Sequence, residues 1–202
     1  LEMSKSKVRN IDSLKKLGAL EYIDVSSTMV SNLDPIKALG NVRYLNASNS
    51  RVFGLDAIEE LFDLEELLLS GTQILDLSYL SRLDRLKRLE VARTGLRILP
   101  DLTTNRDLEI LDISETIISD LTPLRTMRNL KELNLAGTKV TDLRKIQDLP
   151  NLTQLDLRDT RLSSLKPLAE MRGLETVFLS SVPPNSTDTL SSLRDRGVDI
   201  QN

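Results

Sequence analysis

Hydrophobic positions recur along the chain with a period of 22 residues. Each unit follows the pattern L-x-x-L-x-L-x-x-T-x-I-x-x-L-x-x-L-x-x-L-x-x, and the units begin at Leu20, Val42, Leu64, Leu86, Leu108, Leu130 and Leu152. The apolar steps are two and three residues long, which excludes a continuous amphipathic helix. No single unit can bury its own leucines, so the pattern predicts units that stack into a solenoid.

Each unit divides into a strand, a turn and a returning segment. The alternation in Leu133-Asn134-Leu135 predicts a short strand with both leucines facing inward. A hydroxyl residue then turns the chain and hydrogen-bonds buried loop backbone. It stands at the ninth position of every unit, as Thr28, Ser50, Thr72, Thr94, Thr116, Thr138 and Thr160. The steps of three that follow predict a 3₁₀-like or short helical segment.

Polar residues before proline predict where these returning segments begin. Asp34-Pro35 and Thr122-Pro123 pair a helix-capping side chain with a proline at the first helical position, and Pro167 stands at the equivalent place. We therefore expect the side chains of Asp34 and Thr122 to cap the segments that follow them.

The repeats divide the chain into three parts. Residues 1–19 form a partial N-terminal repeat, residues 20–173 form seven complete repeats, and residues 174–202 form a last strand and a C-terminal cap. Within the cap, residues 186–196 are expected to form a helix that ends at Gly197, and residues 198–200 a final strand. The in-register start is open to two interpretations: the chain begins in the middle of a repeat of a longer solenoid, or it has a native start at Met3.

One repeat departs from the pattern. The unit at residues 86–107 carries Asn105 where a leucine is expected, after the segment Leu99-Pro100-Asp101-Leu102. We expect a distorted convex turn here, either a tolerated defect or, as the weaker alternative, a partner site.

This pattern resembles the leucine-rich repeat family over essentially the whole chain. The 22-residue period, with segments such as ISDLTPLRTMRNL and GTKVTDLRKIQDLPNL, is similar to phosphatase-regulating and internalin-type bacterial members. The resemblance implies an α/β fold: a right-handed solenoid with a concave parallel β-sheet, a convex side of short helical or 3₁₀ turns, and a helical C-terminal cap. Thr or Ser replaces the family's usual Asn. Neither the helical N-terminal cap nor the immunoglobulin-like C-terminal cap of internalins is evident, which argues against an adhesin role.

Composition narrows the chemistry that the chain can perform. The sequence contains no Cys and no His, so thiolate or imidazole metal sites, a cysteine nucleophile and the commonest general base are excluded. The net charge of −3 provides no overall basic field for nucleic acid, and no run of about 18 apolar residues predicts a membrane span. No P-loop is present, and carboxylates two repeats apart in one column lie roughly 10 Å from each other. We therefore expect a non-enzymatic protein without a metal or cofactor.

Candidate binding residues lie on the predicted concave face, between and beside the strand leucines. Tyr22 and Tyr44 fall in neighbouring repeats with Leu68 diagonal to them, so these three apolar side chains should face solvent together. Exposed apolar patches mark partner sites, and Tyr is enriched at binding hot spots. The alternative is that the tyrosines only cover the sheet. The polar rim of the predicted site consists of Asp24, Asn46, Glu66, Arg88, Glu90 and Asp112, with Ile110 beside it.

Further side chains on this face are weaker candidates for binding a partner. Ile110 and Ile117 are expected to form a second apolar spot, and Phe178 a third unless the C-terminal helix covers it. Opposite charges in neighbouring repeats are expected to pair across the sheet. They are Arg88, Arg93, Arg158 and Arg161 on one side and Glu90, Asp112, Glu115, Asp156 and Asp159 on the other.

These observations predict a protein–protein interaction module that binds a partner protein on its concave face. Two alternatives stay open: a regulatory or targeting subunit of an enzyme such as a phosphatase, and a structural segment of a larger multidomain protein. Nucleic acid is not an expected partner, because acids offset the arginines and no aromatic side chains are interleaved with them. A monomer is expected. The absence of cysteine favours an intracellular or bacterial setting over a disulfide-rich extracellular one.

Overall fold

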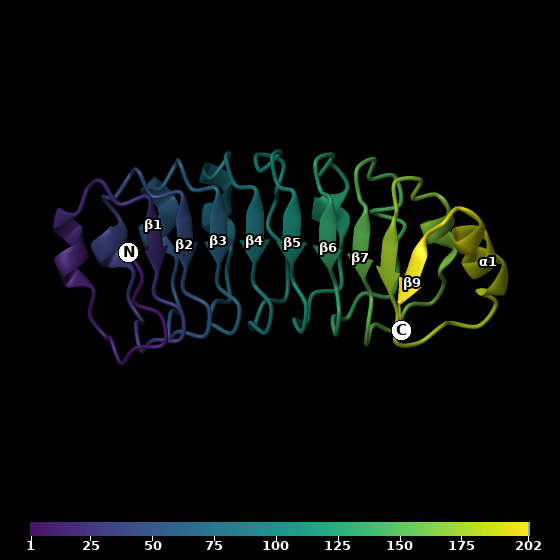
Figure 1. The fold of residues 1–202 in the computed structure, drawn as a ribbon, viewed down its shortest axis with the longest axis horizontal. Helices are drawn as coiled ribbons and strands as arrows, with labels where there is room; N and C mark the ends of the chain where they lie inside the picture. Colours follow the sequence, from purple (N-terminus) through teal and green to yellow (C-terminus); the bar gives the residue numbers. More distant parts are fainter. Residues whose placement is uncertain (202) are drawn as a thin grey trace.

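The computed structural model describes residues 1–201, which form a single stack of parallel coils (Figure 1). One nine-stranded sheet runs the length of the molecule, with its strands side by side in sequence order. The strands are β1 (Tyr22–Asp24), β2 (Tyr44–Asn46), β3 (Glu66–Leu68), β4 (Arg88–Glu90), β5 (Ile110–Asp112), β6 (Glu132–Asn134), β7 (Gln154–Asp156), β8 (Thr176–Phe178) and β9 (Asp199–Gln201). The predicted leucine-rich-repeat solenoid is therefore confirmed.

The register of the sheet follows the sequence period. From β1 to β8 each residue pairs with the residue 22 positions later, as in Tyr22 with Tyr44 and Leu45 with Leu67, whereas in the last pair Thr176 is opposite Asp199. The central residue of each strand from β1 to β8 is a buried aliphatic side chain, a leucine in six of them, whereas the residues on either side face outward. A fully buried leucine contributes about 1.5–3 kcal/mol relative to an exposed one, so the stacked leucines are the main stabilising element.

The returning segments form short 3₁₀ helices on the side of the core away from the sheet. They are η1 (Asp12–Lys16), η2 (Asp34–Ile36), η3 (Asp56–Glu60), η4 (Ser78–Arg82), η5 (Thr122–Leu124) and η6 (Lys166–Ala169). The prediction that Asp34 and Thr122 cap these segments was wrong. Asn32 Oδ1 accepts the N–H of Asp34 at 2.8 Å, and Asp120 Oδ1 accepts the N–H of Thr122 at 2.8 Å. A residue two positions earlier is needed because its side chain can fold forward onto the first helical N–H in an Asx turn.

The ninth-position hydroxyls hydrogen-bond to backbone groups, as predicted, and the groups that they bind lie in the same coil. Thr72 Oγ1 donates to the carbonyl of Leu69 at 2.6 Å, and Thr116 Oγ1 donates to that of Ile113 at 2.7 Å. Thr28, Thr94, Thr138 and Thr160 repeat this bond. Ser50 differs, since its Oγ accepts the N–H of Val52 at 3.4 Å. These threonines are buried, and each satisfies a carbonyl that the turn has removed from the sheet.

The irregular repeat has a structural explanation. No helix forms between β4 and β5, but none forms between β6 and β7 either, so this feature does not set the irregular repeat apart. Asn105 is fully buried, and its Nδ2 donates to the carbonyls of Leu80 at 2.9 Å and Leu83 at 2.7 Å in the preceding coil. The side-chain amide of Asn105 therefore links two neighbouring coils through hydrogen bonds inside the core. Because Asn105 is buried, it cannot contact a partner.

The C-terminal cap matches its prediction closely. Helix α1 (Thr187–Asp195) ends before Gly197, whose φ of +81° is the left-handed conformation that glycine favours after a helix. The chain then pairs as β9 with β8 and closes the sheet (Figure 1). Leu193 is buried in the common core, so the cap covers apolar side chains that the last coil would otherwise expose.

Candidate functional site

The outward side chains of the strands form one continuous surface, which we call the sheet face. Strand alternation places the first and third residue of each three-residue strand on it. It therefore contains all ten predicted binding residues: Tyr22, Tyr44, Leu68, Asp24, Asn46, Glu66, Arg88, Glu90, Ile110 and Asp112.

The two tyrosines meet as predicted. Their rings stack with centroids 4.2 Å apart and an angle of 7° between the planes. Tyr22 is 43% exposed and Tyr44 is half-buried beneath it. Burial, with a smaller contribution from the hydrogen bond to the Tyr22 hydroxyl, raises the pKa of Tyr44 to about 12. The stack presents a rigid aromatic surface that needs little further ordering on binding.

Leu68 extends the aromatic surface by one strand. It pairs in register with Asn46, so it lies diagonally from Tyr44 on the same face, and it is half-buried. The predicted apolar group at the N-terminal end of the sheet face is therefore present as a contiguous set.

Several of the predicted rim residues also have a structural role in their own turns. Asp24, Asn46 and Asp112 each accept a backbone N–H from the residue two positions later, at 2.8 to 3.0 Å. The same bond recurs at Asn134 and Asp156. These Asx turns end the strands, so substitution at these positions would alter local structure as well as the surface.

The charge pairing on the sheet face differs from the prediction. Arg88 pairs with Glu90 on its own strand at 2.5 Å, and Arg158 pairs with Asp156 in the same coil at 2.5 Å. In each case the hydrogen bond to the carboxylate raises the pKa of the arginine. Within residues 1–201, Arg93 is the only one of the four arginines that forms the expected bridge to a neighbouring repeat, at 3.6 Å from Glu115. Pairing within a coil prevails because residues two apart on a strand point to the same face.

A charge ladder between repeats does exist, one position before the strands, where we did not expect it. Lys87 contacts Glu65 at 2.7 Å, and Lys131 contacts Glu109 at 2.7 Å. Arg43 approaches Glu65 from the other side at 3.4 Å. Positively and negatively charged residues alternate at 22-residue spacing in the sequence, and this alternation could have predicted the ladder.

The two weaker apolar spots are not assembled as expected. Ile110 lies on the sheet face, but Ile117 lies beyond the turn, where its N–H bonds to the carbonyl of Leu96 in the preceding coil. Phe178 is half-buried, and the guanidinium of Arg158 lies 5.2 Å from its ring centroid. A cation–π contact with Arg158 therefore covers one side of Phe178.

The sheet face is strongly acidic. Among its outward positions in β1 to β9, seven carboxylates oppose one guanidinium: Asp24, Glu66, Glu90, Asp112, Glu132, Asp156 and Asp199 against Arg88. The carboxylates between β4 and β7 surround a hollow of about 170 Å³. Since the whole chain has a net charge of only −3, its negative charge is concentrated on this face. Such a face attracts cationic groups at long range.

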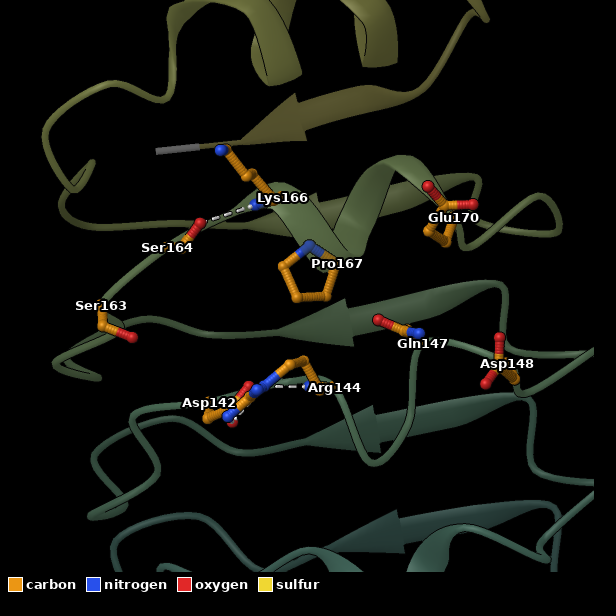
Figure 2. A pocket seen from close by; sticks show the side chains of 9 residues that line it. All are labelled: Asp142, Arg144, Gln147, Asp148, Ser163, Ser164, Lys166, Pro167 and Glu170. Carbon is orange, nitrogen blue, oxygen red and sulfur yellow. Dashed lines mark hydrogen bonds and ion pairs between the residues drawn. The ribbon is translucent and has the colours of Figure 1, made fainter.

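A larger hollow, of about 530 Å³, opens on the opposite side between two neighbouring returning segments (Figure 2). Its hydroxyl groups serve the backbone: Ser163 donates to the carbonyl of Thr141 at 2.9 Å, and Ser164 accepts the N–H of Lys166 at 3.1 Å. Arg144 is paired with Asp142 at 2.6 Å. Ser164 and Lys166 therefore meet through the backbone rather than as a nucleophile and a base.

Among residues 1–201 no cluster of three or more acidic side chains is arranged to hold a metal ion. Within the same residues, no helix has the length and apolar character needed to cross a membrane.

The geometry defines a class of protein, a repeat solenoid with an ordered outer sheet. Residues 128–170 match the family model for leucine-rich repeats, described as containing two copies. This match shows leucine-rich repeats in that part of the chain, and proteins with such repeats typically mediate protein–protein interaction.

Solved structures from two bacteria share the fold. An internalin of Listeria monocytogenes is 22% identical, with a TM-score of 0.90, and the match covers 100% of this chain and 66% of that one. Internalin C2 of the same species is 27% identical, with a TM-score of 0.84 over 89% of this chain and 80% of that one. A leucine-rich-repeat protein of Leptospira interrogans is 24% identical, with a TM-score of 0.89 over 98% of this chain and 53% of its own length. Among curated proteins, no sequence matches the chain.

Proposed function

We propose that this chain binds a partner protein on its sheet face, anchored by Tyr22, Tyr44 and Leu68. The observation that carries the proposal is the stacked tyrosine pair, because a rigid aromatic surface that remains exposed has no role in the core. Trp, Tyr and Arg dominate binding hot spots, and a preordered anchor avoids the entropy cost of ordering side chains.

The surrounding carboxylates support a partner with complementary chemistry. Apolar side chains of the partner pack on the tyrosine stack, and its lysines or arginines face the acidic strands β4 to β7. Binding should therefore be fastest at low ionic strength, where screening of the acidic face is weakest.

The test is capture of partners from a lysate of the source organism. We would compare the wild-type chain with a Tyr22→Arg/Tyr44→Arg/Leu68→Arg variant and with a Phe62→Arg control. Phe62 is 52% exposed on the turn that follows η3, outside the sheet face. Each variant must first show the circular dichroism spectrum of the wild type. A protein retained by the wild type and the control but lost from the triple variant supports the proposal, whereas equal retention by all three contradicts it.

The acidity of the sheet face also favours a second candidate, a regulatory or targeting subunit that holds an enzyme such as a phosphatase. The identity of the captured protein separates the two. A catalytic protein whose activity changes on binding supports the regulatory role, and a protein without activity supports plain recognition.

A further inference from the structure

A hollow of about 460 Å³ lies between the repeats at residues 86–107 and 108–129, where each returning segment leads into the next strand. Two arginines, two threonines and one asparagine line it, and no acidic residue does: Arg106, Arg128, Thr103, Thr126 and Asn129. All five residues are exposed, so the hollow is open to solutes. We call it the arginine hollow.

The two arginines occupy equivalent positions of neighbouring repeats, so the stack places them next to each other. Asparagines of the following coils fix their backbones. Asn129 Nδ2 donates to the carbonyl of Arg106 at 3.0 Å, and Asn151 Nδ2 donates to that of Arg128 at 2.8 Å. Arg106 Nε also donates to the carbonyl of Thr103 at 3.3 Å. The repeat therefore holds two like charges side by side, and an anion between them would relieve their repulsion.

The segment that carries Thr103 and Arg106 is fixed from the other side as well. Asn105 lies between them in the chain, and its amide donates to the carbonyls of Leu80 and Leu83 in the preceding coil. This turn is thereby held to the coil before it, whereas the arginine hollow lies toward the coil after it. Groups that are ordered before a ligand arrives lose little entropy on binding.

No carboxylate neutralises these two cations. Within residues 1–201, neither Arg106 nor Arg128 has a carboxylate oxygen within 4.0 Å of its guanidinium. Arg85 in the preceding repeat, by contrast, is paired with Asp63 at 2.6 Å. A ligand in the arginine hollow therefore contacts the cations rather than the acids of the surrounding positions, which do not line it: Asp84, Asp101, Asp107 and Asp148.

We infer that the arginine hollow binds the phosphate group of a phosphate monoester. Each guanidinium presents N–H groups in a planar fork that matches two phosphate oxygens. Two guanidiniums balance the charge of about −2 that a phosphate monoester carries near pH 7, and the hydroxyls of Thr103 and Thr126 supply donors for its third oxygen. A single carboxylate has one charge and two oxygens, so it would satisfy only one of the two guanidiniums.

A phosphorylated small molecule and a phosphorylated side chain of another protein present this same group. The volume of the hollow, about 460 Å³, leaves room for the group that carries the phosphate. A lipid membrane is a weaker candidate, because no apolar side chain lines the hollow and two cations attract a lipid surface only weakly. The inference is independent of the proposed function, since the arginine hollow and the sheet face share no residue.

The test is a titration of the full chain followed by nitrogen–proton correlation NMR at constant ionic strength. The probes are glycerol phosphate, an acetyl-Gly-phosphoserine-Gly-amide tripeptide and the same tripeptide with glutamate in place of phosphoserine. The variant is Arg106→Gln/Arg128→Gln, which should fold because both side chains are exposed. Arg51→Gln/Arg97→Gln is the matched control. It removes the same charge at exposed positions that follow the strands, whereas the arginines of the hollow precede them.

At least one phosphate probe should shift the signals of Thr103, Arg106, Thr126 and Arg128, and the tighter of the two identifies the source of the phosphate. Its Kd should rise by about tenfold or more in the Arg106→Gln/Arg128→Gln variant and stay within about twofold in the control. The glutamate tripeptide should bind about tenfold more weakly than the phosphoserine tripeptide, or not at all. Three results would overturn the inference: no shift at the hollow with either phosphate probe, equal binding by the variant and the control, or arginine-dependent binding only of phosphatidylcholine vesicles that contain phosphatidic acid.

Discussion

Replacement of Asn105 by Asp tests whether the irregular repeat is fastened from inside the core. The side chain is fully buried and donates two hydrogen bonds, at 2.7 and 2.9 Å, to carbonyls of the preceding coil. An aspartate of the same shape removes both donors and turns a carboxylate oxygen toward those carbonyls. Uncompensated buried charge costs about 3–5 kcal/mol, a large part of the ~5–15 kcal/mol stability of a typical domain.

Two further substitutions separate charge from packing. Asn105→Ala loses two hydrogen bonds at about 1 kcal/mol each and leaves space behind, so we expect a loss of about 2–3 kcal/mol. Asn105→Leu restores the residue of the repeat pattern and removes the unpaired Oδ1. Both carbonyls keep a backbone donor, from Leu83 N–H and Leu86 N–H, so the leucine variant should match or exceed wild-type stability.

The assay is urea-induced unfolding followed by far-ultraviolet circular dichroism at several pH values. Burial raises the folded-state pKa of an aspartate at position 105 above its unfolded value of about 3.9. The folded variant therefore gains a proton more readily, and its deficit relative to the wild type should shrink as the pH falls through that raised pKa. An Asn105→Asp variant within about 1 kcal/mol of the wild type at pH 7 would refute the placement of this side chain in the core.

Three other predictions follow from contacts in the structure. Thr116→Val should lower the free energy of unfolding by about 1–2 kcal/mol in urea titrations, because the carbonyl of Ile113 loses its buried partner, whereas an unchanged value would contradict the role of the hydroxyls. The pKa of Tyr44 is raised to about 12, chiefly by burial, so its tyrosinate absorbance should appear well above pH 10. The free energy of unfolding should then fall as the pH rises from about 10 to 12. Tyr22→Ala should shift the absorbance titration of Tyr44 to lower pH. Hydrogen bonds lower the pKa of three turn carboxyls, those of Asp76, Asp120 and Asp142. Their contribution to stability should be complete above the unfolded pKa of about 3.9 and should be lost as the pH drops through their folded pKa values. A thermal midpoint that does not change between pH 5 and pH 2 would contradict this.

The fold could be predicted in detail because every repeat carries the same pattern of hydrophobic positions. An apolar period of 22 residues fixes which side chains are inside, and stacking then sets the register, as in the pairing of Tyr22 with Tyr44. The cap was also predictable, since Gly197 and the helical pattern before it are local signals.

The errors arose where several local solutions satisfy the same pattern. Asp34 and Asn32 are both capping residues by type, and only backbone geometry decides that Asn32 accepts the hydrogen bond. Arg88 had possible partners on both sides, and the partner on its own strand prevailed. Asn105 looked like a defect because the carbonyls that it binds come from the preceding coil.

The proposed binding surface could be predicted only in part. The tyrosine stack follows directly from the repeat spacing, because equivalent positions in neighbouring coils must touch. The exposure of Phe53 and Leu75 was not predicted, since both stand at positions that the repeat leaves variable. Which chemistry a surface recognises depends on the partner, and this information is not contained in the repeat pattern.

The most direct test of the central claim is the Kd of the captured partner for the chain, measured by isothermal titration calorimetry. The proteins to compare are the wild type, Tyr22→Ala/Tyr44→Ala and the control Phe62→Ala. Removal of a hot-spot pair costs about 2 kcal/mol or more, so the Kd of the double variant should rise by about 30-fold or more, while that of the control stays within about twofold. Equal Kd values for all three proteins would place the binding site away from the sheet face and contradict the proposed function.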